Sequence, residues 1–311
     1  MFGSRRTSTV AASEMEWLKL LDHWDSKAPK SRKKIKKMGR AGIPESLRGK
    51  VWSALARTDD IKKPGVYDGL LAQRNEEVFD IIERDIARCF PEHPMFAEEG
   101  GPGQTNLRNV LRAYAMYNPD IGYCQGMGML AGMMLMHMPA EESFWLLVAT
   151  LQTILKDFYT PQLLQLRRDA AVFESLLYKT SRRVARHLDK QEVTPLMYMT
   201  SWFMTVFTTT LPWESALRVW DMVYCEGVKP LFRTSLAIFD IFKTELLKEC
   251  PTNAEILSLL LHLPQEPLEP ELLIKRSLRV KVKNKAITNL RNNIAGKVIG
   301  DRGTISLVKR K

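Results

Sequence analysis

The sequence lacks the short motifs that mark many nucleotide-binding and metal-dependent enzymes. It contains no GxxxxGK[ST] phosphate loop, no GxSxG elbow and no HExxH pair. The four cysteines form no CxxC pair, and no histidine lies at zinc-ligand spacing from any of them. We therefore expect the free thiols of a reduced, intracellular protein, and we expect no metal site.

Long apolar runs and strand patterns are also missing. The most apolar stretch, residues 126–138, is shorter than the roughly 20 residues that a membrane span needs. No apolar segment of a targeting signal follows the two arginines near the N-terminus. Amphipathic spacing typical of helices recurs instead, for example in residues 14–24 and 75–89, so the expected fold class is all-α.

Positive charge is concentrated at the two ends of the chain. Residues 1–40 hold eleven Lys or Arg against four acids, and residues 271–311 hold twelve against two. Such arms attract acidic membrane surfaces, nucleic acid or acidic proteins, or they are solvated tails that aid solubility, and these interpretations stay open. Nucleic-acid binding ranks low, because no aromatic residues are interleaved with the charges of the basic runs.

Composition divides the chain into three parts. Residues 1–13 are expected to be disordered, and residues 14–262 form the ordered domain, including a basic linker at residues 27–40. Residues 263–311 are expected to be a proline-containing linker and a basic tail.

The tail contains one apolar stripe at helical spacing, made of Ile287, Leu290, Ile294 and Val298. A basic amphipathic helix of this kind indicates a membrane-surface or partner-docking element. The alternatives are that the stripe folds back on the domain or stays disordered.

Three short segments in the first half of the chain carry a resemblance to a known family. They are Arg48-x-x-x-Trp52 after Gly42-Ile43-Pro44, Ile82-x-x-Asp85-x-x-Arg88, and Tyr123-x-Gln125 within Gly122–Met127. In this order they resemble the RxxxW, IxxDxxR and YxQ motifs of TBC domains, which activate Rab-class GTPases. The resemblance covers roughly residues 14–262. The short segments at residues 137–141 and 225–229 resemble sequences of the EPI-type subgroup, which binds ezrin-scaffold proteins.

The resemblance implies a fold and a mechanism. The fold is an all-α, two-lobed (V-shaped) helical domain with both catalytic groups on the N-terminal lobe. Arg88 corresponds to an arginine finger and Gln125 to a glutamine finger, supplied in trans to the GTPase. GTP and Mg²⁺ belong to the partner, so the chain has no cofactor and no independent active site of its own. The implied setting is vesicle trafficking, in the cytoplasm or peripherally on membranes.

Four further residues are expected to support this site. Asp85, three residues before Arg88, is placed to hold the guanidinium, and Tyr123 to orient the glutamine loop. Arg48 and Trp52 are expected to support the site through hydrogen bonds and core packing. Taken alone, Arg88 would be a surface cation near a helix end, Asp85 its ordinary i,i+3 partner and Gln125 a loop residue.

The chain departs from the family pattern at two positions. Cys89 occupies a position where the family often has threonine, and Gly128 one where asparagine is frequent. Neither departure removes a catalytic group. The rival function is a non-catalytic Rab-binding scaffold with the same fold, and the presence of both Arg88 and Gln125 counts against it.

Overall fold

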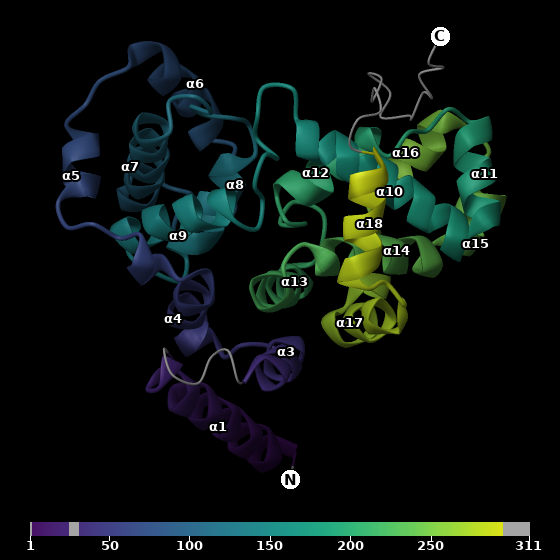
Figure 1. Ribbon diagram of the computed structural model, residues 1–311, viewed down its shortest axis with the longest axis horizontal. Helices are drawn as coiled ribbons and strands as arrows, with labels where there is room; N and C mark the ends of the chain where they lie inside the picture. Colours follow the sequence, from purple (N-terminus) through teal and green to yellow (C-terminus); the bar gives the residue numbers. More distant parts are fainter. Residues whose placement is uncertain (1, 25–30, 295–311) are drawn as a thin grey trace. The chain divides into compact units, whose positions relative to one another are not determined.

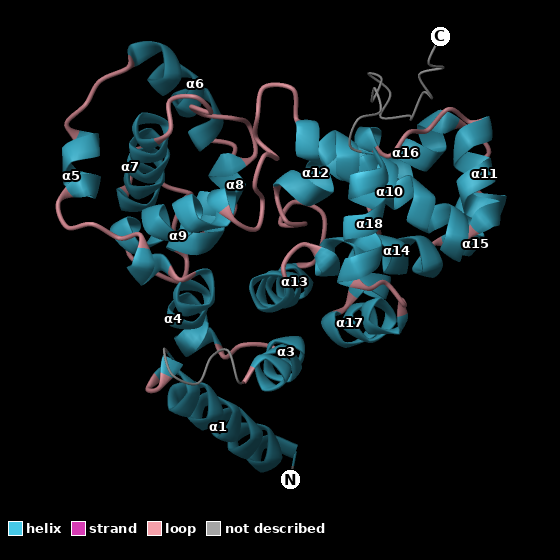
Figure 2. Ribbon diagram, viewed as in Figure 1, coloured by secondary structure: helices cyan, strands magenta, loops and turns pink. Residues whose placement is uncertain are grey.

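The computed structural model describes residues 2–24 and 31–294, with side chains from residue 11 onward. Within these residues all regular structure is helical and there is no strand, which confirms the expected all-α class (Figures 1 and 2). The chain divides after Lys156 into two compact units, residues 1–156 and 157–311, in agreement with the two expected lobes.

Unit 1 is built around one long helix, α7 (Pro102–Tyr117). The helices that pack against it are α5 (Val66–Leu71), α6 (Glu76–Ile86), α8 (Met127–Leu135) and α9 (Ala140–Gln152). The other elements are α1 (Phe2–Leu21), α3 (Arg32–Ala41), α4 (Glu45–Ala56) and the 3-10 turn η1 (Thr58–Asp60). Helix α8 is apolar on nearly every side, and it is buried along almost its whole length, as such a sequence requires.

Unit 2 is built around α10 (Leu164–Thr180) and α14 (Lys229–Ile241), which contact each other. An aromatic cluster that includes Phe173, Trp202 and Phe239 fills its core. The remaining helices are α11 (Arg182–Lys190), α12 (Leu196–Met204), α13 (Trp213–Glu226), α15 (Lys243–Lys248), α16 (Asn253–Leu261), the 3-10 turn η2 (Glu266–Leu268), α17 (Pro270–Arg279) and α18 (Asn284–Ile294).

The predicted end of the ordered domain near residue 262 is wrong. Helix α17 packs against α13 and α14, with Leu273 and Ile274 buried, and α18 packs against α10. Proline did not stop the fold here because Pro267 and Pro270 lie in the first turns of η2 and α17, where a missing N–H costs nothing.

The apolar stripe of the tail is used for packing, as one of the alternatives had it. Ile287 and Ile294 are buried, while Val298 lies outside the described residues. Arg291 donates from Nε and Nη2 to the two carboxylate oxygens of Asp169, at 2.7 and 2.5 Å. The Asp169 side chain is fully buried, so this bidentate pair fixes α18 on α10.

The N-terminal boundaries also differ from prediction. The chain is helical from Phe2, where residues 1–13 were expected to be disordered, because no glycine or proline interrupts the run from residue 4 to the amphipathic segment. The basic linker at residues 27–40 contains α3, since Ile35 and Met38, one turn apart, give it an apolar face that is buried. Residues 25–30 lie outside the described part.

Candidate functional site

The site begins where α6 ends. The Asn75 side chain caps the first turn by accepting from the Val78 N–H at 3.3 Å, and the helix closes at Ile86. Arg88 follows in a turn in which its backbone N–H donates to the Asp85 carbonyl at 3.1 Å. The Arg88 side chain is 64% exposed, so its guanidinium is available to another molecule.

The carboxylate of Asp85 joins two segments of the chain. It is nearly buried and forms an ion pair with Nη2 of Arg88 at 2.6 Å through one oxygen. Its other oxygen accepts a hydrogen bond from the hydroxyl of Tyr123, 38 residues further along. Burial and this hydrogen bond to Asp85 raise the pKa of Tyr123 well above its usual value, so the phenol stays protonated and remains a donor.

The second segment is the short loop between α7 and α8. Gly122 and Gly126 both have positive φ, 61° and 102°, which only glycine adopts without strain, and between them Gln125 is exposed. Because Tyr123 is bound to Asp85, the loop that carries Gln125 is tied to the turn that carries Arg88. Two exposed side chains therefore come from neighbouring segments of unit 1.

Arg48 and Trp52 lie at the other end of α8. Both are buried on α4, and Arg48 donates from Nη2 to the carbonyl of Ile43 at 3.0 Å. The indole of Trp52 meets the imidazole of His137, just after α8, edge to face at 5.1 Å. Burial and the charge of Arg48 lower the pKa of His137 to about 4, so the imidazole is neutral. These two residues therefore support α8 from the end opposite to Gln125.

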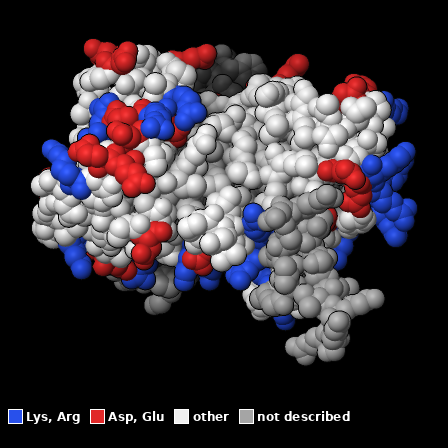
Figure 3. Space-filling view, turned by 90° about the horizontal axis from the view of Figure 1, so that it is seen from above, with Lys and Arg blue, Asp and Glu red and all other residues white. Residues whose placement is uncertain are grey.

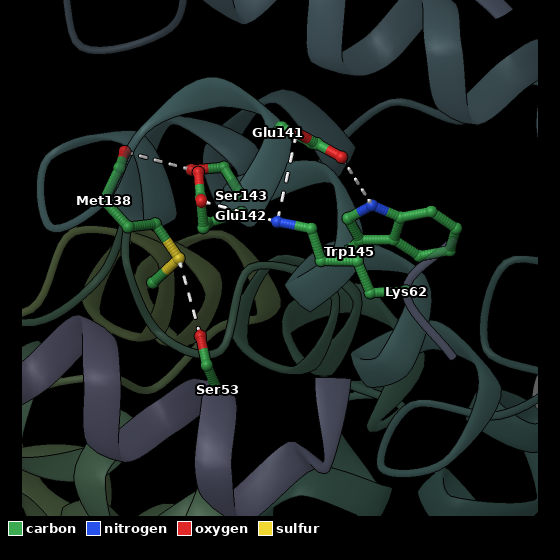
Figure 4. A network of polar contacts seen from close by, with 7 residues as sticks. All are labelled: Ser53, Lys62, Met138, Glu141, Glu142, Ser143 and Trp145. Carbon is green, nitrogen blue, oxygen red and sulfur yellow. Dashed lines mark hydrogen bonds and ion pairs between the residues drawn. The ribbon is translucent and has the colours of Figure 1, made fainter. Parts of the chain in front are cut away.

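A polar network fixes α4 and the segment just after η1 to the start of α9 (Figure 4). Lys62 lies between Glu141 and Glu142, with N–O distances of 3.9 and 3.5 Å, and Glu141 also accepts from the indole of Trp145. Ser53 of α4 contacts the sulfur of Met138, whose carbonyl accepts from Ser143. The network holds in place the connection that contains His137.

The described part of the chain shows neither a metal-binding cluster nor a membrane-spanning helix. Among residues 2–24 and 31–294 no cluster of three or more His, Cys, Asp or Glu side chains has the arrangement of a metal site. No helix in that part of the chain combines the length and the apolar character required to traverse a bilayer.

Sequence reasoning singled out the residues of this candidate site but missed one contact. Asp85 contacts both Arg88 and Tyr123, Gln125 is exposed two residues after Tyr123, and Trp52 packs in the core. It treated Cys89 and Gly128 as two separate departures from a pattern, whereas a side chain at Gly128 would strike the sulfur of Cys89. Two glycines four residues apart on a buried helix, Gly128 and Gly132, were the available signal of a close approach.

The fold and the site define an all-helical protein that exposes an arginine and a glutamine from two segments joined through one buried aspartate. A family model described as the Rab-GTPase-TBC domain matches residues 45–247. The chain belongs to this family.

Relatives and solved structures agree with the assignment. TBC1 domain family member 10A of Mus musculus is 40% identical over 279 residues, covering 88% of this chain and 56% of that protein. TBC1 domain family member whacked of Drosophila melanogaster is 39% identical, covering 88% and 77%. These relatives agree with the EPI-type subgroup expected from the sequence. The Chlamydomonas flagellar RabGAP TBC domain superposes with a TM-score of 0.71 at 25% identity, covering 86% of this chain and 93% of that one.

The chain spans only part of several relatives. It covers 33% of the length of TBC1 domain family member 10B of Mus musculus, which is 40% identical over 266 residues. The activity, substrates and partners of the longer relatives are therefore only proposed for this chain.

Proposed function

We propose that this chain is a GTPase-activating protein that stimulates GTP hydrolysis by a Rab-class small GTPase. In this proposal Arg88 and Gln125 enter the partner's active site in trans, while GTP and Mg²⁺ are bound by the partner. The observation that carries the proposal is the Asp85 carboxylate, which holds Arg88 directly and the Gln125 loop through Tyr123.

The chemistry of the two side chains suits this reaction. Negative charge spreads over the γ-phosphoryl oxygens in the transition state, and a guanidinium that neutralises it in trans is worth about 10³–10⁵ in rate. An amide has both an acceptor and donors, so Gln125 can orient the attacking water while it contacts the phosphate. Asp85 limits the freedom of Arg88 before the partner binds, which reduces the ordering that catalysis requires.

The surface charge of unit 1 favours a protein partner. In Figure 3, acidic and basic side chains lie beside one another at the end of the view where unit 1 is seen. Nucleic acid binds to faces of one positive sign, whereas protein interfaces use mixed charge to fix their register. No nucleic-acid partner is therefore proposed.

Membrane contact is proposed only through charge. The apolar stripe that would enter a bilayer has two of its residues buried, but Lys283 and Lys285 are exposed at the start of α18. Cations next to an acidic leaflet contribute about 1 kcal/mol each, which would favour peripheral encounter with a lipid-anchored Rab during vesicle trafficking.

Single-turnover GTP hydrolysis with a panel of GTP-loaded Rabs tests the proposal. We expect at least one Rab to be accelerated by catalytic amounts of the chain. The rival function, a non-catalytic scaffold, predicts binding to a GTP-loaded Rab with no acceleration of hydrolysis for any member of the panel.

A further inference from the structure

The turn after α6 packs against α8 at two glycines that lie one helical turn apart. A Cβ atom at Gly128 would lie 2.5 Å from Sγ of Cys89, and one at Gly132 would lie 2.6 Å from Cε2 of Phe90. Non-bonded carbon atoms sit at about 3.5–4.0 Å from their neighbours, so both positions require the absence of a side chain. Phe90 itself has a positive φ of 54°, which is uncommon outside glycine.

A hydrogen bond and burial hold the Cys89 side chain in place. Its thiol donates to the carbonyl of Asp85 at 3.2 Å, and its side chain is buried. Burial raises the pKa of the thiol to about 12, so it is protonated at neutral pH and is neither a nucleophile nor a metal ligand. The sulfur acts as a filler of fixed size between the turn and α8.

Each residue of this contact is a near neighbour in the chain of one of the two proposed fingers. Arg88 directly precedes Cys89, and Gln125 precedes Gly128 by three residues. The same Cβ position at Gly128 would be 3.6 Å from the hydroxyl of Tyr123, so the packing contact adjoins the Asp85–Tyr123 hydrogen bond. A hydrogen bond and a packing contact together fix both the distance and the orientation of two segments, which neither does alone.

We propose that Cys89 and Gly128 are a size-matched pair that sets the spacing between Arg88 and Gln125, and that both are positioning residues for the hydrolysis of the partner's GTP. The inference rests on the proposed function. Since Cys89 and Gly128 touch neither the nucleotide nor the water, they act through the segments that carry the fingers. A displacement of about 1 Å in a catalytic group can cost on the order of 10²-fold in rate.

The first test adds one carbon atom at the contact. Gly128→Ala forces the turn and α8 apart by roughly the difference between 2.5 Å and an ordinary contact. Alanine is a better helix former than glycine, so helix propensity does not explain a loss. We expect the maximal stimulated rate to fall about 10- to 100-fold. Affinity for the GTP-loaded Rab should stay within about twofold, because the fingers act mainly in the transition state.

The second test removes the atom that the new carbon would strike. In the double variant Cys89→Ala/Gly128→Ala the missing sulfur leaves room for the alanine, and we expect at least about tenfold of the lost rate to return. A purely additive effect of the two substitutions predicts that the double variant is no better than Gly128→Ala. If Gly128→Ala does not fold, Cys89→Ala alone is used, with an expected loss of about threefold to tenfold from the gap it leaves.

Gly69→Ala is the matched control. It makes the same change in a helix of unit 1, α5, where a Cβ atom would meet nothing within 4 Å, and it should keep wild-type activity. Binding to a Rab with GDP and aluminium fluoride is measured beside activity, and it should weaken in Gly128→Ala and recover in the double variant.

The outcomes separate the two claims. If the wild-type chain accelerates hydrolysis but Gly128→Ala is fully active, or the double variant is not rescued, the positioning inference is overturned and the proposed function stands. If the wild-type chain accelerates no Rab, the proposed function fails and the inference fails with it.

Discussion

Asp85 and Arg88 lie one helical turn apart and are joined by an ion pair of 2.6 Å, although the carboxylate is nearly buried and the guanidinium is largely exposed. The buried carboxylate thus holds one terminal nitrogen of a guanidinium that is otherwise largely exposed. We expect Arg88→Ala to lower stimulated GTP hydrolysis by at least about 10²-fold, with an unchanged circular dichroism spectrum. Arg88→Lys should rescue little, because lysine lacks the planar fork.

The matched control for Arg88 is Arg84→Ala. Arg84 is an exposed arginine one turn earlier on α6, and its removal should leave the rate within about twofold of wild type, as is usual for exposed charges. Single-turnover hydrolysis with an excess of GTPase-activating protein gives both rates. An Arg88→Ala chain with near wild-type activity would sink the arginine-finger assignment.

Gln125 is exposed in the loop before α8, and its replacement tests the second finger. We expect Gln125→Ala to reduce the stimulated rate by at least about 10²-fold, as for the loss of one transition-state stabiliser. Gln73→Ala, at another exposed glutamine of unit 1, should have no effect. If Gln125→Ala retains activity while the partner's own glutamine is required, the partner orients the water and Gln125 does not.

Tyr123→Phe isolates the hydrogen bond that ties the two segments. The variant keeps the ring but removes the hydroxyl that donates to Asp85. A hydrogen bond to a charged group contributes about 1.5–3 kcal/mol. We expect the part of this energy that appears in the transition state to lower the stimulated rate by about tenfold. Tyr117→Phe, near the end of α7, is the control. Equal rates for Tyr123→Phe and wild type would show that packing alone positions the loop.

The pair of Arg291 and Asp169 predicts a pH-dependent loss of stability. Removing Arg291 leaves a fully buried carboxylate without its charge partner, which costs about 3 kcal/mol or more. Burial raises the pKa of Asp169, and Arg291 is the largest cause that lowers it, so in Arg291→Ala the pKa rises further. An acid whose pKa is raised by folding loses stability as the pH rises above its unfolded value.

The deficit of Arg291→Ala should therefore narrow as the pH falls from about 8 toward the pKa of an unfolded aspartate, about 3.9, because the raised pKa of Asp169 lets the folded state take up the proton first. Thermal melting of wild type and variant at each pH measures the difference. The control Arg276→Ala breaks an exposed pair with Asp240 and should shift the midpoint little at either pH. A deficit that is constant with pH would mean that Asp169 does not titrate in this window.

Truncation tests whether the C-terminal helices belong to unit 2. We expect a chain that ends at residue 262 to melt at a clearly lower temperature, or to fail to fold, because it lacks Leu273, Ile274 and the Arg291 pair. A chain that ends at Ile294 keeps all described helices and should melt like the full chain. If the shorter chain melts normally, the packing of α17 and α18 contributes nothing to stability.

Local patterns indicated the pairing of Asp85 with Arg88, because both residues belong to one helix and the turn that follows it. The spacing of residues 82, 85 and 88 placed Asp85 beside Arg88, and the amphipathic segment expected from residue 75 agrees with the start of α6, which Asn75 caps. The link from Asp85 to Tyr123 spans 38 residues, and no periodicity in the chain indicates it. It depends on α7 bringing α6 and α8 to the same side of unit 1.

The C-terminal helices were missed for a different physical reason. Three prolines and an excess of positive charge are typical of a solvated linker and tail, and both features are present in residues 263–294. Most charges on α17 and α18 are exposed, while Leu273, Ile274, Ile287 and Ile294 are buried. The partner of Arg291 lies 122 residues earlier, so its role is visible only in three dimensions.

All the groups assigned to the chemistry come from residues 85–128, within unit 1. A stretch this short can be inherited as one piece while the rest of the chain diverges. Under the proposed function, substitutions elsewhere can change which GTPase is recognised and leave the two proposed fingers intact. Within the stretch we expect the opposite, because the proposed pairing makes a side chain at position 128 depend on a smaller residue at position 89.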